Sequence, residues 1–422
     1  MPEGSILSDD FLRELINVGE VDILVGLPTY NDAKTVAQVV QAIRAGLLNY
    51  FPRQRAAIIN VDGGSRDASQ DLVRAASISD LQHLSNIHAL RTLHCISTRY
   101  EGGPASGTAL RTVLSAAELL RAKVCAVFSA DSTNTEPEWI NRLLSPVVMD
   151  NYDLITPTYR RNKFDGMLVQ NLVYPMNRAV YSKRIREPYP TEFAFSGRLG
   201  SHFAAQDIWS QDVGKEGAGI YLTIAAITGN FRLGQSFIGT KARVDTGAAD
   251  LVRAMRQTVG VLFWSLDPNF AVWSSNGASE SVPTFGAESD LTLEPLRVNR
   301  KRLFQMFALG VAELEPVLKS ILEPSTVEEL QRAAAVGEES FRYSDELWVR
   351  TIYEFAASYH KQVMNRDHIV QALAPLYRGR AFTFLAENRD ASAEEVETKV
   401  EGLCREFENR KPYLLGMWNE RK

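Results

Sequence analysis

The sequence predicts an α/β protein with a Rossmann-like, mainly parallel sheet followed by a helical domain. Through the first half, apolar segments of strand length alternate with segments of helical periodicity, at residues 21–27, 35–48, 55–61, 66–76, 90–96, 106–120 and 124–128. Strand, loop and helix repeated in this order give a parallel sheet with helices on both faces. This alternation therefore indicates the fold class.

The second observation is a change of pattern near residue 285. Beyond it, helical periodicity dominates, at residues 296–322, 327–336, 343–363, 366–386 and 393–409. We therefore expect an N-terminal catalytic domain over residues 1–285 and a helical C-terminal domain over residues 286–422. The polar stretch 274–290 fits a flexible lid and an ordinary surface loop about equally well.

Length and composition are those of an ordinary globular protein. The chain has 422 residues, enough for two domains, of which 45% are hydrophobic and 23% charged. Its formal net charge of −5 provides no general attraction for nucleic acid or anionic lipid, so no nucleic-acid partner is expected. A phosphate ligand would need a local group of Arg, Lys or backbone N–H donors.

The cysteines and the N-terminal residues favour a cytoplasmic protein. Cys95, Cys125 and Cys404 are odd in number and widely spaced, which suits free thiols better than a disulfide framework or a zinc site. The first residues are acidic and do not resemble a secretory signal. No apolar run reaches about 18 residues, so we expect no membrane span.

Polar loops follow three of the predicted strands, at Asn31–Asp32, Asp62–Ser65 and Ser129–Asn134. Ligands of parallel α/β sheets bind outside the carboxyl ends of the strands. Because all three loops fall at such ends, the sequence predicts a binding site at this edge of the sheet. This coincidence is the strongest functional indication that the residues give by themselves.

Two carboxylates stand out in these loops. Asp62 precedes two glycines, where the backbone can approach a ligand, and it suits ribose hydroxyls or the edge of a nucleotide base. The alternative is that Asp62 caps the helix beginning near Arg66. Asp131 suits a divalent cation that bridges a sugar-diphosphate. Its alternative is an N-cap for the helix near 138–144.

Basic and glycine-rich segments offer sites for anions. The glycine-rich stretch 102–111 opens a helix, whose free N–H groups suit a phosphate, and Arg111 lies one turn inside. A plain turn is the alternative. Arg160 and Arg161 follow a predicted strand and suit an anionic acceptor, as does Arg198 further on, although such residues often belong to solvated loops.

Taken in order, these segments resemble the GT-A glycosyltransferases, in particular mannosylglycerate synthase and its relatives that make glucosyl-3-phosphoglycerate. The similarity covers nearly the whole chain. It lies in residues 27–31, 61–67, 103–111, 128–131 with 137–140, 239–243 with 250–255, and 343–347 with 376–380.

The resemblance implies a hexosyltransferase, retaining at the anomeric carbon, that uses a GDP- or UDP-sugar and a small hydroxyl acceptor such as glycerate. The residues expected to bind the nucleotide-sugar are Pro28, Tyr30, Asn31, Asp62, Ser106, Arg111, Ser129 and Asp131. Asp131 and Arg243 are the expected catalytic residues, and Arg160, Arg161 and Arg198 the acceptor-binding ones. A homodimer is also expected, because symmetric dimers are the commonest assembly.

This chain departs from the family pattern where the chemistry should lie. Ser129 replaces the first Asp of the Asp-x-Asp segment, Ser106 replaces a Lys, and Arg243 stands where a metal-binding His is expected, with Asp245 close by. Two hypotheses follow. Either Mg²⁺ or Mn²⁺ is held by Asp131 and Asp245, or Arg243 with Arg111 or Lys241 replaces the cation.

Two other functions remain in view. A decayed site would leave a protein that binds nucleotide-sugar or acts as a scaffold. A nucleotidyltransferase is disfavoured, because such enzymes carry a glycine-rich, basic loop directly after the first strand. Residues 28–32 have neither feature.

Overall fold

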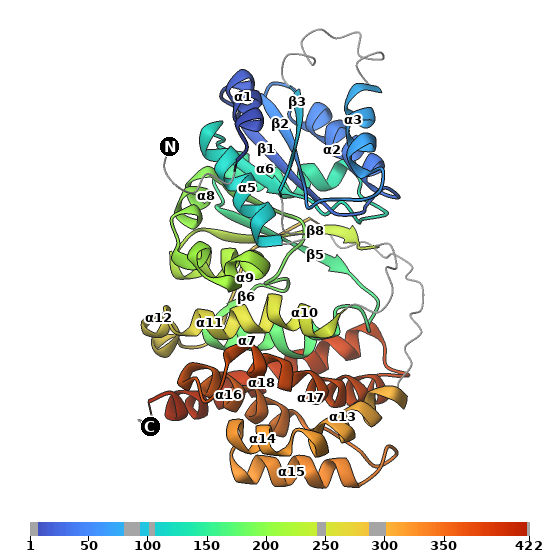
Figure 1. Cartoon of the computed structure of the whole chain (residues 1–422), viewed down its shortest axis with the longest axis vertical. Helices are drawn as coiled ribbons and strands as arrows, with labels where there is room; N and C mark the ends of the chain where they lie inside the picture. Colours follow the sequence, from blue (N-terminus) through green and yellow to red (C-terminus); the bar gives the residue numbers. More distant parts are fainter. Residues whose placement is uncertain (1–6, 80–92, 101–105, 243–249, 287–300, 420–422) are drawn as a thin grey trace. The chain divides into compact units, whose positions relative to one another are not determined.

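The computed structural model describes residues 7–79, 93–100, 106–242, 250–286 and 301–419 (Figure 1). The chain divides into two compact units. The first, called the sheet unit here, comprises residues 1–160, 189–247 and 282–291. The second, called the helical unit, comprises residues 161–188, 248–281 and 292–422.

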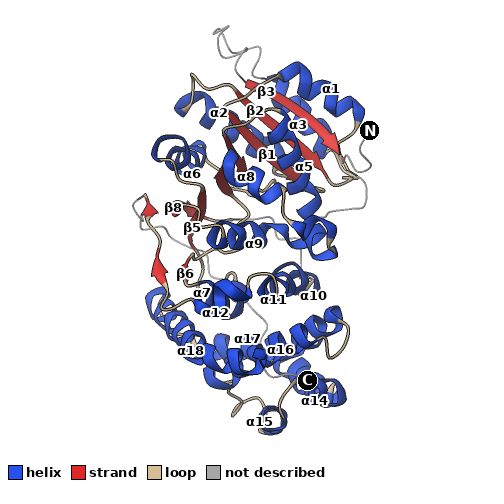
Figure 2. Ribbon diagram, turned by 90° about the vertical axis from the view of Figure 1, so that its left-hand side faces the viewer, coloured by secondary structure: helices blue, strands red, loops and turns tan. Residues whose placement is uncertain are grey.

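The described part of the sheet unit is built on an eight-stranded sheet in the order β10-β8-β5-β7-β4-β1-β2-β3 (Figure 2). The strands are β1 (Ile23–Thr29), β2 (Ala56–Asp62), β3 (Leu93–Arg99), β4 (Val124–Val127), β5 (Leu154–Arg160), β7 (Phe193–Ser196), β8 (Leu233–Thr240) and β10 (Thr284–Phe285). All neighbours pair in parallel except β7, which runs antiparallel to both β4 and β5.

Helices follow the strands of the sheet unit. They are α1 (Asp9–Val18), α2 (Val36–Tyr50), α3 (Ser69–Ser79), α5 (Ser106–Leu119), α6 (Pro137–Asp150), α8 (Gly197–Ala204), η3 (Asp207–Ser210) and α9 (Asp212–Thr228). Local sequence fixes several of their starts. Ser8 caps α1 by accepting the Phe11 N–H, and Ser196 caps α8 by accepting the Leu199 N–H.

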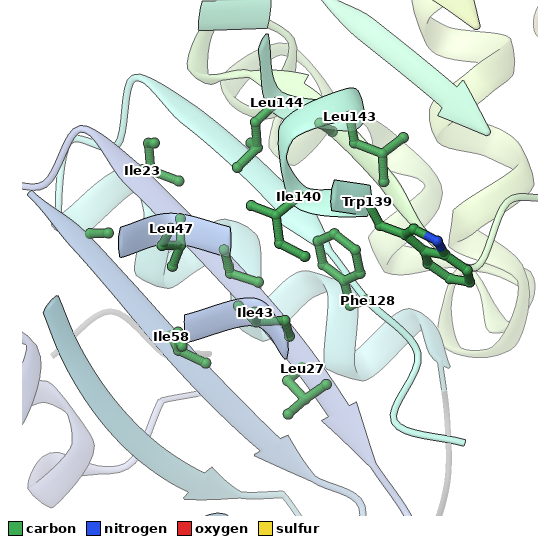
Figure 3. Close-up of a cluster of buried hydrophobic side chains, with 14 of the residues drawn as sticks. Ile23, Leu27, Ile43, Leu47, Ile58, Phe128, Trp139, Ile140, Leu143 and Leu144 are labelled. Atoms are coloured by element: carbon green, nitrogen blue, oxygen red, sulfur yellow. The ribbon is translucent and has the colours of Figure 1, made fainter. Parts of the chain in front are cut away.

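Alternate residues of β1 face opposite layers of helices. Ile23 and Leu27 belong to a core formed with α2 and α6, in which Ile43 and Ile140 are fully buried (Figure 3). On the other face, a Cβ on Gly26 would lie 2.5 Å from the Val113 side chain of α5. Glycine therefore lets α5 approach the sheet closely.

The helical unit contains a long C-terminal series of helices, drawn from orange to red in Figure 1. These are α13 (Lys301–Glu313), α14 (Glu315–Ile321), α15 (Pro324–Ala335), α16 (Asp345–Lys361), α17 (Arg366–Glu387) and α18 (Ala393–Asn419). Ser344 caps α16 at its start, and Gln362 ends it in the left-handed conformation.

Earlier segments of the chain complete the helical unit. They form η2 (Val169–Val173), α7 (Tyr174–Tyr181), β6 (Lys183–Arg184), α10 (Leu251–Met255), η4 (Arg256–Gly260), α11 (Val261–Leu266), α12 (Phe270–Ser275) and β9 (Glu280–Ser281). Two ion pairs of a single arginine fasten α7 to α18 within this unit. Arg178, which is buried, lies 2.6 Å from Glu401 and 2.8 Å from Glu408.

The predicted fold class is confirmed: a mainly parallel sheet covered by helices, and a helical C-terminal region. The two units do not follow the single expected boundary at residue 285, because residues 161–188 and 248–281 pack with the C-terminal helices. Within the described ranges, none of the helices combines the length and the apolar character needed to cross a bilayer.

Candidate functional site

The carboxyl ends of β1, β2 and β4 meet at one edge of the sheet. Thr29, the last residue of β1, pairs with Asp62, the last of β2, and Gly26 pairs with Val127, the last of β4. The polar loops that follow these strands therefore share this edge, as the sequence predicts. We call it the carboxyl edge.

Hydrogen bonds join the loop after β1 to the loop after β2. The Asn31 N–H donates to Ser65 Oγ (2.9 Å), and Asn31 Oδ1 accepts the Arg66 N–H (2.9 Å). The Asp32 N–H donates to Ser69 Oγ at 2.8 Å. Asn31 has a φ of 59°, a left-handed conformation that asparagine tolerates better than most residues. Asn31, expected to contact the nucleotide, therefore shapes the edge through its backbone and amide oxygen.

Asp62 is enclosed by donors from its own unit. Its exposed fraction is 0%. Oδ1 accepts from the hydroxyls of Thr29 (3.0 Å) and Ser65 (2.5 Å), while Oδ2 accepts from the N–H of Gly64 (3.0 Å) and from Gln70 Nε2 (2.9 Å). Both oxygens are occupied, so Asp62 holds the loop in shape. Contact of its carboxylate with a nucleoside stays a prediction that would require these bonds to be exchanged.

Asp32 is a carboxylate that the sequence analysis did not place among the site residues. Burial raises its pKa from 3.8 to about 6, and the nearby charges of Asp131, Asp67 and Asp62 act in the same direction. The Tyr30 N–H, which donates to Asp32 Oδ2 at 2.7 Å, opposes the shift. Its position three residues after the last residue of β1 was the available sequence signal.

Asp131 lies in the loop after β4, beside Asp32. It is half-buried, and Ser129 Oγ donates to its Oδ1 at 2.6 Å. The loop is tied to the start of α2 because Thr35 Oγ1 donates to the Ala130 carbonyl at 2.6 Å. The N-cap position of α6 belongs to Glu136 and not to Asp131. The capping alternative therefore does not explain this carboxylate.

The expected metal ligands are only partly visible. Arg243 and Asp245 lie outside the described residues, as does the side chain of Ser106. Across the described ranges, no three His, Cys, Asp or Glu side chains are grouped so as to hold a metal ion. Asp131 is thus the one predicted ligand that the structure places.

A buried ion pair adjoins the same edge. Glu192 directly precedes β7, whose Phe193 pairs with Val127 at the end of β4. Lys241 Nζ lies 2.9 Å from Glu192 Oε2, and the side chains are only 10% and 1% exposed. The hydroxyl of Tyr159 also donates to Glu192. The positive charge of Lys241 is therefore balanced by a carboxylate that the sequence analysis missed. Its signal was a lone acidic residue before an apolar strand.

The remaining predicted residues of the sheet unit lie on separate elements. Pro28 lies in β1, and Tyr30, which is partly exposed, follows that strand. Arg111 lies in α5, with its guanidinium 6.0 Å from the ring centre of Trp209. Arg160 ends β5 and pairs with Thr240 of β8, which places it at the carboxyl edge.

Of the three acceptor-binding candidates, Arg198 lies apart from Arg160 within the sheet unit. Arg161 belongs to the helical unit, where it lies 2.5 Å from the buried carboxylate of Glu187. Arg198 lies at the opposite, amino edge of the sheet unit: its partner Asp153, at 2.5 Å, directly precedes β5. Arg198 therefore cannot join Asp131 in one site of this structure. Its expected role was assigned from charge alone, without knowledge of which strand end it follows.

No family model and no curated protein matches the sequence. Among solved structures, the chain is similar to glucosyl-3-phosphoglycerate synthase from Mycobacterium tuberculosis in complex with phosphoglyceric acid, with 19% identity, 63% of this chain and 85% of that chain covered, and a TM-score of 0.44. It is similar to the same enzyme in complex with Mn²⁺, uridine-diphosphate and glucosyl-3-phosphoglycerate, with 20% identity, coverage of 63% and 85%, and a TM-score of 0.44. No residue role follows from a likeness of this degree.

Proposed function

We propose that the sheet unit transfers a hexosyl group from a GDP- or UDP-sugar to a small, glycerate-like hydroxyl acceptor. The observation that carries this proposal is the position of Asp131. It lies at the carboxyl edge, in a segment that resembles the Asp-x-Asp segment of GT-A glycosyltransferases, and its place is not explained by helix capping. Ligands of parallel α/β sheets bind at such an edge.

Several carboxylates lie near one another at the carboxyl edge, an arrangement that suits a divalent cation. Asp32, Asp67 and Asp131 lie near one another there, and the positive charge of Lys241 is balanced by Glu192. A diphosphate brought to this edge needs added positive charge. We therefore propose that Asp131 ligates Mg²⁺ or Mn²⁺, with diphosphate oxygens as further ligands. Bound there, the cation would neutralise charge on the departing diphosphate.

The chain's own residues would position the two substrates. Ser129, which donates to Asp131 Oδ1 at 2.6 Å, holds this carboxylate oxygen in place. We propose that Pro28, Tyr30 and Asn31 contact the nucleoside. The adjoining loop is held in shape by Asp62. We propose that Arg160, at the end of β5, orients an anionic acceptor. Retention at the anomeric carbon is part of the proposal and rests on the resemblance.

A turnover assay tests the proposal. UDP-glucose, GDP-glucose and GDP-mannose are each offered with glycerate and with 3-phosphoglycerate, in Mn²⁺, in Mg²⁺ and in EDTA. We expect product with one donor, its loss in EDTA, and an equatorial anomeric proton by NMR, which is the α configuration of the donor. Asp131→Asn should lower kcat/KM by about a hundredfold or more. Asp10→Asn, an exposed carboxylate of α1, is the matched control. Full activity of Asp131→Asn would contradict the proposal, and activity that survives EDTA would remove the cation from it.

A donor-binding protein without turnover is the second candidate function. Ser129 at the position of the first family Asp favours it, since this removes one cation ligand. This candidate predicts that calorimetry detects binding of a nucleotide-sugar while no acceptor gives product.

The homodimer likewise stays a prediction, which light scattering of the purified chain would check.

A further inference from the structure

A cavity of about 500 Å³ opens at the amino edge of the sheet unit. Its apolar wall includes Ile23 and Val124, the first residues of β1 and β4, with Val147 from the last turn of α6 and the ring of Tyr152. The proposed transfer reaction uses none of these residues. The cavity therefore has room and apolar surface for a small molecule away from Asp131.

Two ion pairs line the mouth of this cavity. Arg198 Nη2 lies 2.5 Å from Asp153 Oδ2, and Lys123 Nζ lies 2.7 Å from Asp22 Oδ1. Asp153 is buried, and Asp22 is only partly exposed. Each pair thus combines a carboxylate set into the wall with a cation that reaches outward.

The protein itself occupies the oxygens of both carboxylates. Asp153 accepts from Ser196 Oγ (2.7 Å), from Arg198 and from the Arg232 N–H (3.0 Å). Asp22 accepts from Lys123 and, through Oδ2, from the Arg55 N–H at 3.0 Å. Burial alone would raise the pKa of each carboxyl, but these donors lower it below 3.8. Both groups stay ionised near neutral pH, and their acceptor capacity is used.

The cationic side chains, in contrast, are mostly exposed to solvent. The side chains of Lys123 and Arg198 are 77% and 72% exposed. Arg232, also exposed, lies with its guanidinium 4.1 Å from the ring centre of Tyr152 and donates to the Asp150 carbonyl at 2.6 Å. That bond offsets the partial negative charge at the end of α6. The hydrogen-bonding capacity left at the mouth is therefore mainly that of N–H donors.

We propose that this cavity binds a small organic anion. Its carboxylate, phosphate or sulfonate group would accept hydrogen bonds from Lys123 and Arg198, and its apolar part would lie against Ile23, Val124 and Val147. The site is independent of the proposed transfer reaction. Because the cations are exposed, binding weakens as salt is added.

Three probes with one ring system and different charge test the proposal: 1-naphthalenesulfonate, 1-naphthol and 1-naphthylmethylammonium. Calorimetry with the full chain at low salt should give the lowest Kd for the sulfonate, by about tenfold or more over the ammonium ion. Equal or tighter binding of the ammonium ion, or no sulfonate binding, would overturn the proposal.

Variants locate the binding within the molecule. Lys123→Gln combined with Arg198→Gln should raise the Kd of the sulfonate by about tenfold. Val148→Trp, which fills the wall without removing charge, should abolish binding while the unfolding temperature shows that the chain still folds. Arg121→Gln is the control, since it removes an exposed cation paired with Glu20 outside the cavity. Unchanged binding in the double variant and in Val148→Trp would place the sulfonate elsewhere and overturn the proposal.

Discussion

The two edges of the sheet unit hold their buried carboxylates in different ways. At the carboxyl edge, the donors that surround Asp62 are neutral hydroxyl, amide and backbone N–H groups, and the carboxylates of Asp32 and Asp131 lie nearby. At the amino edge, guanidinium and ammonium groups pair with Asp153 and Asp22 and remain exposed.

The difference decides what each edge can bind. Where neutral donors stabilise the carboxylates, these donors add no positive charge, and a cation alongside a phosphate ligand would offset the repulsion. Where exposed Lys and Arg side chains stabilise the carboxylates, an anion can bind to these side chains without an added metal cation. The pair of Glu192 and Lys241 is an exception at the carboxyl edge, because both members are buried together.

The largest expected effect concerns this exception. Lys241→Met leaves Glu192 buried without its cation, so the free energy of unfolding should fall by about 3–5 kcal/mol. Combining it with Glu192→Gln should restore most of the loss, as denaturant titration would show. Lys319→Met, in the exposed pair with Glu315, should have no measurable effect. A small loss for Lys241→Met would mean that the buried carboxylate of Glu192 does not depend on its cation.

Asp62→Asn should have the next largest effect. The new amide group would face N–H donors that now point at a carboxylate oxygen, among them those of Gly64 and Gln70. We expect a loss of about 3 kcal/mol in denaturant unfolding, relative to Asp10→Asn. Near-neutral behaviour would show that the loop holds its shape without the charge.

Asp32 should make stability depend on pH. Its folded-state pKa of about 6 lies above 3.8, so the folded state binds the proton more tightly than the unfolded state does. Its contribution is therefore complete below pH 3.8 and is lost as the pH rises through about 6. Urea midpoints measured across this window should show a downward slope that is weaker in Asp32→Asn. An identical slope in both proteins would contradict the assignment.

Arg198→Gln should have the smallest effect on stability. Arg198 is largely exposed, and Asp153 keeps the Ser196 hydroxyl and the Arg232 N–H. The unfolding temperature should therefore change less than in Lys241→Met. A comparable change in the two variants would erase the distinction between the edges.

The sequence was sufficient for the first parallel strands of the sheet, the helical tail and the edge at which the polar loops lie. Periodicity reports burial, and the end of an apolar run reports the end of a strand, so the loops at Asn31, Asp62 and Ser129 could be located from local pattern alone. The structure confirms where these strands end.

Partners distant in the chain could not be predicted. Glu192 and Lys241 meet only because β7 inserts beside β4, and Arg198 lies at the amino edge for the same reason. In an antiparallel strand the amino end lies at the carboxyl edge of the sheet. No local sequence pattern indicates that a strand runs in this direction. The assignment of Arg198 to the acceptor depended on charge, which carries no information about the edge.

Strand β7 also constrains the order in which the sheet unit can be completed during synthesis. In the sheet, β5 reaches β4 only through β7, yet β7 follows β5 in the chain after residues 161–188, which belong to the other unit. A nascent chain that has emerged as far as residue 160 can pair β1 to β4 but has no place for β5. The apolar strand formed by residues 154–160 therefore stays unpaired with β7 until residues 193–196 leave the ribosome. Premature chain ends between these points should be the fragments of this protein most prone to aggregate and most in need of a chaperone.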